Sequence, residues 1–396
     1  MGPRLYHFFK PINQSMLRAF SSKSHGVPKV QFMHVIQEKN SGKGRLHMAI
    51  PEIVSKLPSL EIDVIKHSKI QKDFMIEQAR DVCKGMQDIL LVAQEQRGSY
   101  EVSINEKAPN GNTVVHVSTP EFFFYPAGSI FSQEIFQQHI ETPLRQTLRK
   151  FPPWLKFHFG TLPIQLSTGE FNGQVVNPRS FINAALYGSC GSDAILRFYS
   201  KKNHCLPSPY APGGKDTIHL PSHPGDPYVT QLNPVAIDYP TVFISQTEVG
   251  NRFIIAMEIC LDHDNRRGLK EFHGYMEKCK QLGEVSSLHG FHAVSSNSIT
   301  LNRNNSAFPI VSHADHNMSN VVVFEVKNSQ QVNNMMEKVW RYIFDQALEK
   351  IEFIESNAPN TWVDAKLKVY KTLSMTTAIE YAYESSNHAP VPGSKG

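Results

Sequence analysis

The chain has 396 residues, of which 40% are hydrophobic and 19% are charged, a balance typical of a folded globular protein and not of a disordered one. Lys and Arg outnumber Asp and Glu by only 40 to 36, and no long basic block is present, which argues against a nucleic-acid-binding protein. No stretch approaches the roughly 20 consecutive apolar residues that a membrane span needs.

The cysteine content indicates where the protein works. The five cysteines are odd in number, widely spaced and lack a Cys-x-x-Cys pair, so they predict neither a disulfide framework nor a zinc ribbon. We therefore expect a reducing compartment, the cytoplasm. The five positions are Cys83, Cys190, Cys205, Cys260 and Cys279.

The first 28 residues differ from the rest of the chain. They carry four basic side chains and several serines, and no acidic residue occurs before Glu38, a composition that resembles an organelle transit peptide. Pro11 interrupts this stretch and no cleavage site is visible. Two interpretations stay open: a disordered basic leader on a cytoplasmic protein, or a transit peptide on an organellar one.

The first half of the chain alternates strands and helices. Short apolar runs predict strands over residues 29–36, 113–119 and 155–160. An insertion at 38–112 contains an amphipathic helix over 68–96, in which apolar residues recur every three or four positions. A further helix over 132–150 is expected to be interrupted at Pro143, where Thr142 can cap a new start.

The second half begins with a predicted hairpin, residues 183–192 and 194–199, that turns at a Gly/Ser cluster. Further strands are predicted over 241–245, 253–260, 288–294 and 320–326. Residues 203–238 are rich in Pro, Gly and His and indicate a long surface excursion, which we expect to act as a lid.

A long helix with one apolar stripe is expected near 328–355. We accordingly divide the chain into a leader (1–28), a catalytic α/β domain (29–327) with insertions at 38–112 and 203–238, a C-terminal helical extension (328–384) and a flexible tail (385–396). Strands that include a hairpin and are separated by helices favour a mixed sandwich over a doubly wound parallel sheet.

Glu121 is the first candidate for chemistry. It ends the strand at 113–119 and lies between Pro120 and four aromatic residues at 122–125, a setting expected to raise the pKa of the carboxyl group so that it accepts a proton near neutral pH. The alternative is a glutamate in an exposed turn.

Cys260 and Lys201 also follow predicted strands. Cys260 stands where a buried strand stops, which fixes its Cβ and leaves the following turn to offer a backbone N–H to an oxyanion. The alternative is a small core residue. Lys201 and Lys202 stand at the far end of the hairpin, and Lys201 shares a strand face with Tyr199.

Three motifs in this order resemble those of the nitrilase, or carbon–nitrogen hydrolase, superfamily. They are the strand Val117-Ser-Thr-Pro-Glu121, the hairpin from Asn183 to Tyr199-Ser-Lys201, and Glu258-Ile-Cys-Leu-Asp262. The resemblance implies an α-β-β-α sandwich of two mixed sheets flanked by helices. It also implies Cys260 as nucleophile, Glu121 as general base and acid, Lys201 as oxyanion cation and Leu261 as the N–H donor.

One part of the family pattern is missing. The family usually has a second glutamate between its lysine and its cysteine, but residues 203–247 contain none. Asp216, Asp226, Asp238 or Glu258 could replace it, and Glu258 shares a face with Cys260 if the strand is regular. This departure supports an alternative class of protein, a catalytically silent nitrilase-fold scaffold.

Two other chemistries are weighed. Cys190, between Gly188-Ser189 and Gly191, could act with one of the 18 histidines as a Cys/His thiol hydrolase, although a turn explains the glycines equally well. A metal site could form at His313-Ala-Asp-His316 or at Asp262-His-Asp264, where a loop-capping role is the alternative.

Taken together, the sequence predicts a thiol-dependent hydrolase of carbon–nitrogen bonds that acts on a small linear amide in preference to a nitrile. The resemblance implies no metal, no organic cofactor and a homodimer.

Overall fold

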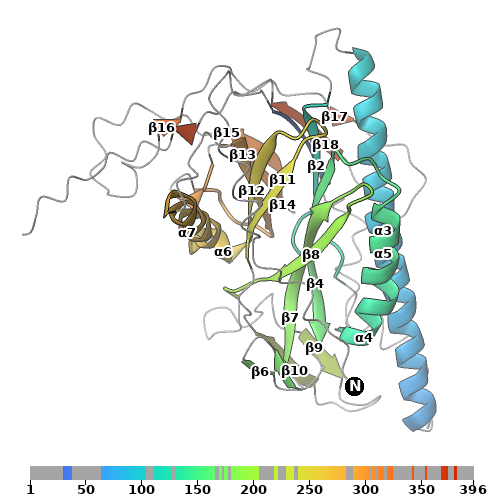
Figure 1. Cartoon of the computed structure of the whole chain (residues 1–396). Helices are drawn as coiled ribbons and strands as arrows, with labels where there is room; N and C mark the ends of the chain where they lie inside the picture. The colour runs from blue at the N-terminus through green and yellow to red at the C-terminus, as the bar shows by residue number, and fades with distance from the viewer. Residues whose placement is uncertain are drawn as a thin grey trace, which may run out of the picture.

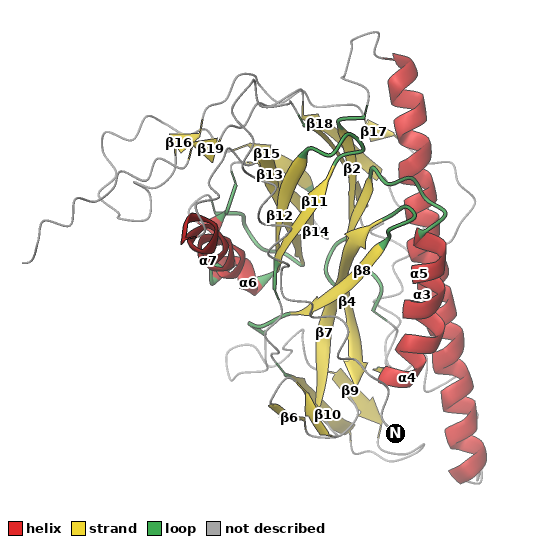
Figure 2. Cartoon of the chain, in the orientation of Figure 1, coloured by secondary structure: helices red, strands yellow, loops and turns green. Residues whose placement is uncertain are grey.

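The computed structural model contains two stacked β-sheets with helices on their outer faces (Figure 1 and Figure 2). It describes residues 30–37, 64–103, 111–125, 130–165, 169–171, 174–176, 180–204, 218–221, 229–235, 240–281, 289–302, 305–308, 310–315, 319–323, 341–342, 353–354, 367–372 and 379–380.

The first sheet has ten strands, and eight of them follow the order β17-β18-β1-β2-β4-β7-β10-β9. Strands β1, β2 and β4 run parallel, whereas the β4–β7 and β7–β8 pairs are antiparallel, so the sheet is mixed. Strand β3 pairs with β4. The bounds are β1 (Gln31–Gln37), β2 (Thr113–Ser118), β3 (Phe131–Ser132), β4 (Leu155–Gln165), β7 (Ser180–Ser189), β8 (Ile195–Ser200), β9 (Ile218–Pro221), β10 (Val229–Pro234), β17 (Phe353–Ile354) and β18 (Leu367–Thr372).

The second sheet has five strands in the order β11-β12-β13-β14-β15, with β12, β13 and β14 parallel and both edges antiparallel. Its strands are β11 (Val242–Gln246), β12 (Arg252–Ile259), β13 (His289–Ser296), β14 (Ile310–Asp315) and β15 (Asn320–Val323). Two small pairs stand apart: β5 (Gly169–Phe171) with β6 (Gln174–Val176), and β16 (Arg341–Tyr342) with β19 (Ile379–Glu380).

The alternation of side chains along β12 explains how this layer is packed. Phe253, Ile255 and Met257 lie in the core shared with the first sheet, whereas Ile254 and Ala256 pack in a separate cluster with the helix on the other face. Because β12 is buried on both faces, its sequence is a continuous apolar run and not an alternating one. Phe32 of β1 reaches across, with its ring centroid 5.5 Å from that of Phe253.

Helices cover both outer faces, so the layers follow the order α-β-β-α and the predicted fold class is confirmed (Figure 1). Beside the first sheet lie α3 (Val64–Ser103), α4 (Gln133–Phe136), the π-helical turn η3 (Gln137–Glu141) and α5 (Thr142–Leu148). The second sheet carries α6 (Leu261–Asp264) and α7 (Arg267–Gln281).

The interruption expected at Pro143 takes the form of the π-helical turn. Proline lacks an N–H and its ring clashes with the carbonyl four residues earlier in a regular helix. The wider turn over Gln137–Glu141 keeps the chain helical at this point. Ser132 caps the start, since its Oγ accepts the N–H of Ile135 at 3.2 Å.

Two regions differ from the prediction. Within 203–238, β9 and β10 add strands to the first sheet, so this segment is more than a surface loop. Within the helix expected at 328–355, β16 and β17 are strands, and β18 then pairs with β1 from Phe32 to Gln37. These strands are fixed by distant partners, which a local helical periodicity cannot reveal.

The leader (1–28) and the tail (385–396) lie outside the described residues. Among the helices that the structure does describe, none combines the length and the apolar character needed to cross a lipid bilayer. Cys83, Cys190 and Cys260 carry free thiols.

Candidate active site

Three side chains from three strand ends meet beside the stacked sheets. Glu121 lies in the turn after β2, Lys201 directly follows β8 and Cys260 directly follows β12. The first two belong to the first sheet and the third to the second sheet. The sequence predicted these three residues as the candidate triad, and the structure brings them together.

Glu121 and Lys201 form a buried ion pair. Lys201 Nζ donates to Glu121 Oε1 at 2.7 Å, and the two side chains are only 1% and 0% exposed. The ammonium group also lies 5.7 Å from the ring centroid of Phe122. Because removing two charges from water is costly, each partner depends on the other for its place in this site.

The neighbouring Lys202 has a different environment. Its side chain is exposed, and its backbone N–H donates to Asp262. The backbone N–H of Lys201 donates instead to Asn183 O on β7 at 2.8 Å. Of the two adjacent lysines, Lys201 is therefore the one inside the site.

Cys260 occupies an unusual backbone conformation, with φ of 47° and ψ of −114°. Positive φ is uncommon and strained for a residue other than glycine, and it persists only where surrounding contacts enforce it. Here the Cys260 N–H donates to Ser295 O and the Cys260 carbonyl accepts the N–H of His263, both at 2.9 Å. The residue thus forms a sharp turn between β12 and α6.

The surroundings of Cys260 keep its thiol protonated. Burial raises the pKa of the Cys260 thiol well above its ordinary value, and the charge of Glu121 and a hydrogen bond with its carboxylate raise it further. Lys201 and the backbone N–H of Asn297 act in the opposite direction. The resting site therefore pairs a thiol with a carboxylate placed to accept its proton.

The turn that carries Glu121 is held from two sides. Gly160 N on β4 donates to Thr119 Oγ1 at 2.7 Å, and Glu121 N donates to Ser296 O on β13 at 3.2 Å. A Cβ at Gly160 would lie only 1.9 Å from the Pro120 carbonyl oxygen. Gly160 must therefore be a glycine, because the turn that carries Glu121 packs directly against the backbone of β4 at this residue.

Asp262 and Arg267 link the surroundings of Lys201 to the turn after Cys260. Asp262 is buried and accepts the backbone N–H groups of Lys202 and Asn203, the latter at 2.7 Å. Arg267 Nη1 donates to Ser200 O at 2.6 Å and to Asp262 Oδ2 at 3.0 Å. The chain on both sides of Lys201 is therefore fixed by side chains from the turn that follows the thiol.

The role of Arg267 was not predicted from the sequence. Asp262 belongs to the motif that resembles the superfamily, but the sequence predicted no contacts for it. The contribution of the Asn297 N–H was also missed, since a backbone donor leaves no mark in the residue type.

The two predicted supporting residues have different positions. Leu261 begins α6 directly after Cys260, so its backbone N–H is next to the thiol along the chain. Glu258, however, does not share a face with Cys260. It follows Ile254 and Ala256 on the face that packs against α7, and the irregular backbone at Cys260 ends the alternation on which the prediction relied.

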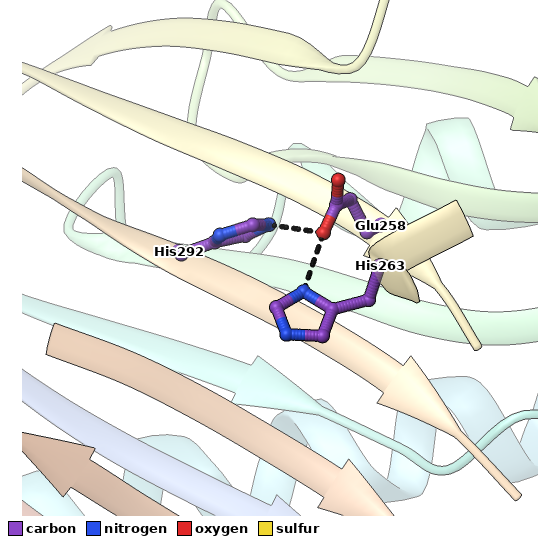
Figure 3. A group of neighbouring side chains, drawn as sticks. All are labelled: Glu258, His263 and His292. Carbon is purple, nitrogen blue, oxygen red and sulfur yellow. Dashed lines mark hydrogen bonds and ion pairs between the residues drawn. The ribbon is translucent and has the colours of Figure 1, made fainter. Parts of the chain in front are cut away.

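Glu258 instead belongs to a second buried cluster with His263 and His292 (Figure 3). Glu258 Oε2 lies 2.7 Å from His263 Nδ1 and 3.0 Å from His292 Nε2. These three potential ligand atoms lie within 4.8 Å of one another, so by distance alone they could hold a metal ion.

The other candidates from the sequence are explained by packing. Burial raises the pKa of the Cys190 thiol to about 12, and the charged group acting on it is Lys156, not an imidazole. His313 and Asp315 lie in β14 and not in a loop, and both contact Ser296 Oγ. His316 lies outside the described residues. Asp262, as described above, binds backbone N–H groups and Arg267.

No protein family model matches the sequence, and a search of curated proteins finds no match either. Among solved structures, the chain is similar to a mutant of an amidase of the nitrilase superfamily from Nesterenkonia AN1, with 11% identity, a TM-score of 0.32 and coverage of 76% of this chain and 81% of that one. It is also similar to Saccharomyces cerevisiae Nit3, a member of branch 10 of the nitrilase superfamily, with 11% identity, a TM-score of 0.33 and coverage of 74% and 78%.

A CN-hydrolase superfamily protein from Xanthomonas campestris has 11% identity, a TM-score of 0.27 and coverage of 57% of this chain and 69% of that one. These proteins bear the name of the superfamily that the three sequence motifs resemble.

Proposed function

We propose that the protein is a divergent member of the nitrilase superfamily, a thiol-dependent hydrolase of carbon–nitrogen bonds acting on a small linear amide. The observation that carries the proposal is the convergence of three groups: a buried Lys201–Glu121 ion pair and the Cys260 thiol, whose pKa is raised by burial and by the charge of Glu121. A nucleophile, a base and a fixed cation within one buried site are what acyl transfer requires.

In the first half of the reaction, Glu121 takes the thiol proton as the Cys260 sulfur attacks the amide carbon. The carbonyl oxygen becomes an oxyanion, which the Lys201 ammonium and the N–H of Leu261 stabilise. Glu121 then returns the proton to the amide nitrogen, the C–N bond breaks, and ammonia or an amine leaves a thioester on Cys260.

In the second half, a water molecule attacks the thioester while Glu121 accepts its proton. The tetrahedral intermediate collapses, the C–S bond breaks, and the thiolate recovers the proton from Glu121. The carboxylic acid is released and the resting site is restored.

The identity of the donors favours an amide over a nitrile. An ammonium group and a backbone N–H suit the oxyanion that forms from a carbonyl, whereas attack on a nitrile places the developing charge on nitrogen. Beyond the site, we propose that the described strands of 29–327 form the catalytic domain; most of 203–238, which the sequence predicts to act as a lid, lies outside the described residues. Catalysis by these residues alone needs no metal or organic cofactor, and we expect a homodimer.

The test is intact-mass spectrometry after incubation with a panel of short aliphatic amides and a rapid acid quench, which stops hydrolysis and preserves a thioester on the protein. The wild type is compared with Cys260→Ala and Glu121→Gln, and Cys83→Ala serves as the matched control because Cys83 is a buried thiol on α3. We expect an acyl adduct on Cys260 in the wild type and in Cys83→Ala, and none in the other two variants.

If no amide leaves an adduct on Cys260, and if Cys260 reacts with iodoacetamide no faster than Cys83, the hydrolase proposal is wrong. The scaffold interpretation then takes its place. Acylation of Cys190 in place of Cys260 would instead support the Cys/His alternative.

A further inference from the structure

The cluster of Glu258, His263 and His292 lies next to the proposed active site but on the opposite face of the second sheet. Glu258 is two residues before Cys260 on β12, and His263 is three residues after it on α6. All three side chains are completely buried. A buried carboxylate must have its charge compensated, so the cluster requires a physical explanation.

The outer nitrogen of each imidazole identifies its tautomer. Asn302 N donates to His263 Nε2 at 3.2 Å, and Ala307 N donates to His292 Nδ1 at 3.1 Å. A ring nitrogen that accepts a hydrogen bond cannot carry a proton. His263 must therefore carry its proton on Nδ1 and His292 on Nε2, and these are the nitrogens that face Glu258 (Figure 3).

The same hydrogen bonds argue against a metal ion. In a metal site the ligating nitrogen is deprotonated and the other ring nitrogen carries a proton, which it donates to a carbonyl or carboxylate. Here each outer nitrogen accepts a backbone N–H. A proton on that nitrogen, as metal binding would require, would point at another N–H group and the hydrogen bond would be lost. The short distances within the cluster are instead explained by the N–H groups of His263 and Gly268 donating to one carboxylate, with His292 Nε2 3.0 Å from the same group.

These contacts stabilise the charged form of the carboxylate. Burial by itself raises the pKa of Glu258, but the contacts with His292 and His263 outweigh it, and the pKa lies below its ordinary value. The contacts come from α6, α7 and β13, and the imidazoles accept the N–H groups of Asn302 and Ala307. One buried anion thus joins the strand before Cys260, the turn after it and three neighbouring segments.

Gly268 shows how closely the parts are packed. A Cβ at that position would lie 2.8 Å from Glu258 Cγ, so α7 approaches the carboxylate at a residue without a side chain. The strained φ of Cys260 needs contacts on both sides to hold it. Glu258 and His263 supply them, since they stand on either side of Cys260 in the chain and bind each other.

We propose that Glu258, with the neutral imidazoles of His263 and His292, is a positioning network that holds the strained Cys260 turn and is not a metal site. The inference deepens the proposed function and rests on it, because it assumes that Cys260 is the reacting residue. Glu258 acts from the far face of the sheet, through the backbone, and does not touch the substrate.

The first experiment needs no variant. Long-range ¹H–¹⁵N NMR of the histidine rings at pH 7 reports each tautomer, and we expect Nδ1–H for His263 and Nε2–H for His292, unchanged by added Zn²⁺. Opposite tautomers, or signals that disappear with Zn²⁺ while one equivalent of the metal is retained after dialysis, would overturn the proposal.

The second experiment tests the effect on Cys260. Glu258→Gln keeps the shape but introduces an amide NH₂ against the N–H groups of His263 and Gly268, and we expect the acylation rate of Cys260 to fall about tenfold to hundredfold, with KM changed by less than about threefold. The matched control, Glu277→Gln, removes the same charge from an exposed position of α7 and should leave both values unchanged.

The outcomes separate the two proposals. If the wild type is not acylated at all, the proposed function fails and the tautomer result still stands. If the wild type is acylated and Glu258→Gln matches it, the positioning role is wrong while the hydrolase proposal survives. If Glu258→Gln does not fold, the ring tautomers of the wild type remain the deciding measurement.

Discussion

Lys201 and Glu121 lie 80 positions apart in the sequence, yet Lys201 Nζ is 2.7 Å from Glu121 Oε1 in a region closed to solvent. The pair creates a stability requirement that is independent of any substrate. Lys201→Met should leave a buried, uncompensated carboxylate and lower the free energy of unfolding by about 3–5 kcal/mol. Urea denaturation at pH 7 measures the change.

The double variant Glu121→Gln with Lys201→Met provides the control. It removes both charges, so it should recover part of the lost stability while remaining inactive. A Lys201→Met protein as stable as the wild type would show that the ion pair is not formed.

A second prediction concerns the backbone of β4. Gly160→Ala places a methyl group against the Pro120 carbonyl, and the turn that carries Glu121 must move. We expect a loss of about 1–3 kcal/mol of stability and of most of the acylation of Cys260. Thermal unfolding and intact mass measure the two effects.

Gly274→Ala is the matched control for Gly160→Ala. Gly274 lies within α7, and a Cβ there would meet no atom within 4 Å. The same substitution should therefore raise stability, by about 0.4–1 kcal/mol, because glycine is entropically costly in a helix. Equal effects at the two positions would contradict the close approach at Gly160.

A third prediction concerns acid. Burial lowers the pKa of His34 and of His158 to about 3, and burial together with both of these histidines lowers the pKa of His116 well below its ordinary value. In the unfolded chain each imidazole returns to a pKa of about 6.5. Above that pH neither state is protonated and the folded state keeps its full stability.

As the pH falls below about 6.5, the unfolded state binds protons that the folded state cannot, so stability is lost, and the loss continues down to pH values near 3. Each histidine contributes up to about 1.4 kcal/mol per pH unit. His34→Phe should flatten the slope of unfolding free energy against pH by that amount between pH 4 and pH 6. An unchanged slope would mean that His34 is not buried in its neutral form.

A fourth prediction concerns the link between the two sheets. Arg267→Lys keeps the charge but cannot bind Ser200 O, Asp262 and Glu271 together as the guanidinium does. We expect kcat on the best amide to fall about tenfold to hundredfold, since small displacements of Lys201 relative to Cys260 are costly. Steady-state kinetics measures this, and the exposed Lys270→Met should behave like the wild type.

The sequence was informative wherever a strand and its end can be recognised from the residue types of the segment itself. The apolar runs before Glu121 and Cys260, and the hairpin before Lys201, located the three residues at strand ends, and only the resemblance of their motifs to a known superfamily suggested that they act together. The pairing of β18 with β1 was not predictable, because a short strand such as Leu367–Thr372 gains its stability from a partner more than 300 residues away.

The orientation of Glu258 was mispredicted for a similar reason. Strict alternation would place it beside Cys260, but the positive φ of Cys260 breaks the alternation at that residue. A cysteine side chain gives no indication of a positive φ, and at Cys260 this conformation is enforced by contacts with α6 and β13. The second buried cluster was hidden for that reason too.

The proposed site draws its thiol from one sheet and its carboxylate–ammonium pair from the other. Neither layer, folded by itself, would contain a reactive centre, and no local segment of the chain could acquire one. Acylation of Cys260 should consequently require that the two sheets are packed against each other. During gradual denaturation we expect it to disappear at the moment the layers part, while the strands of each are still paired.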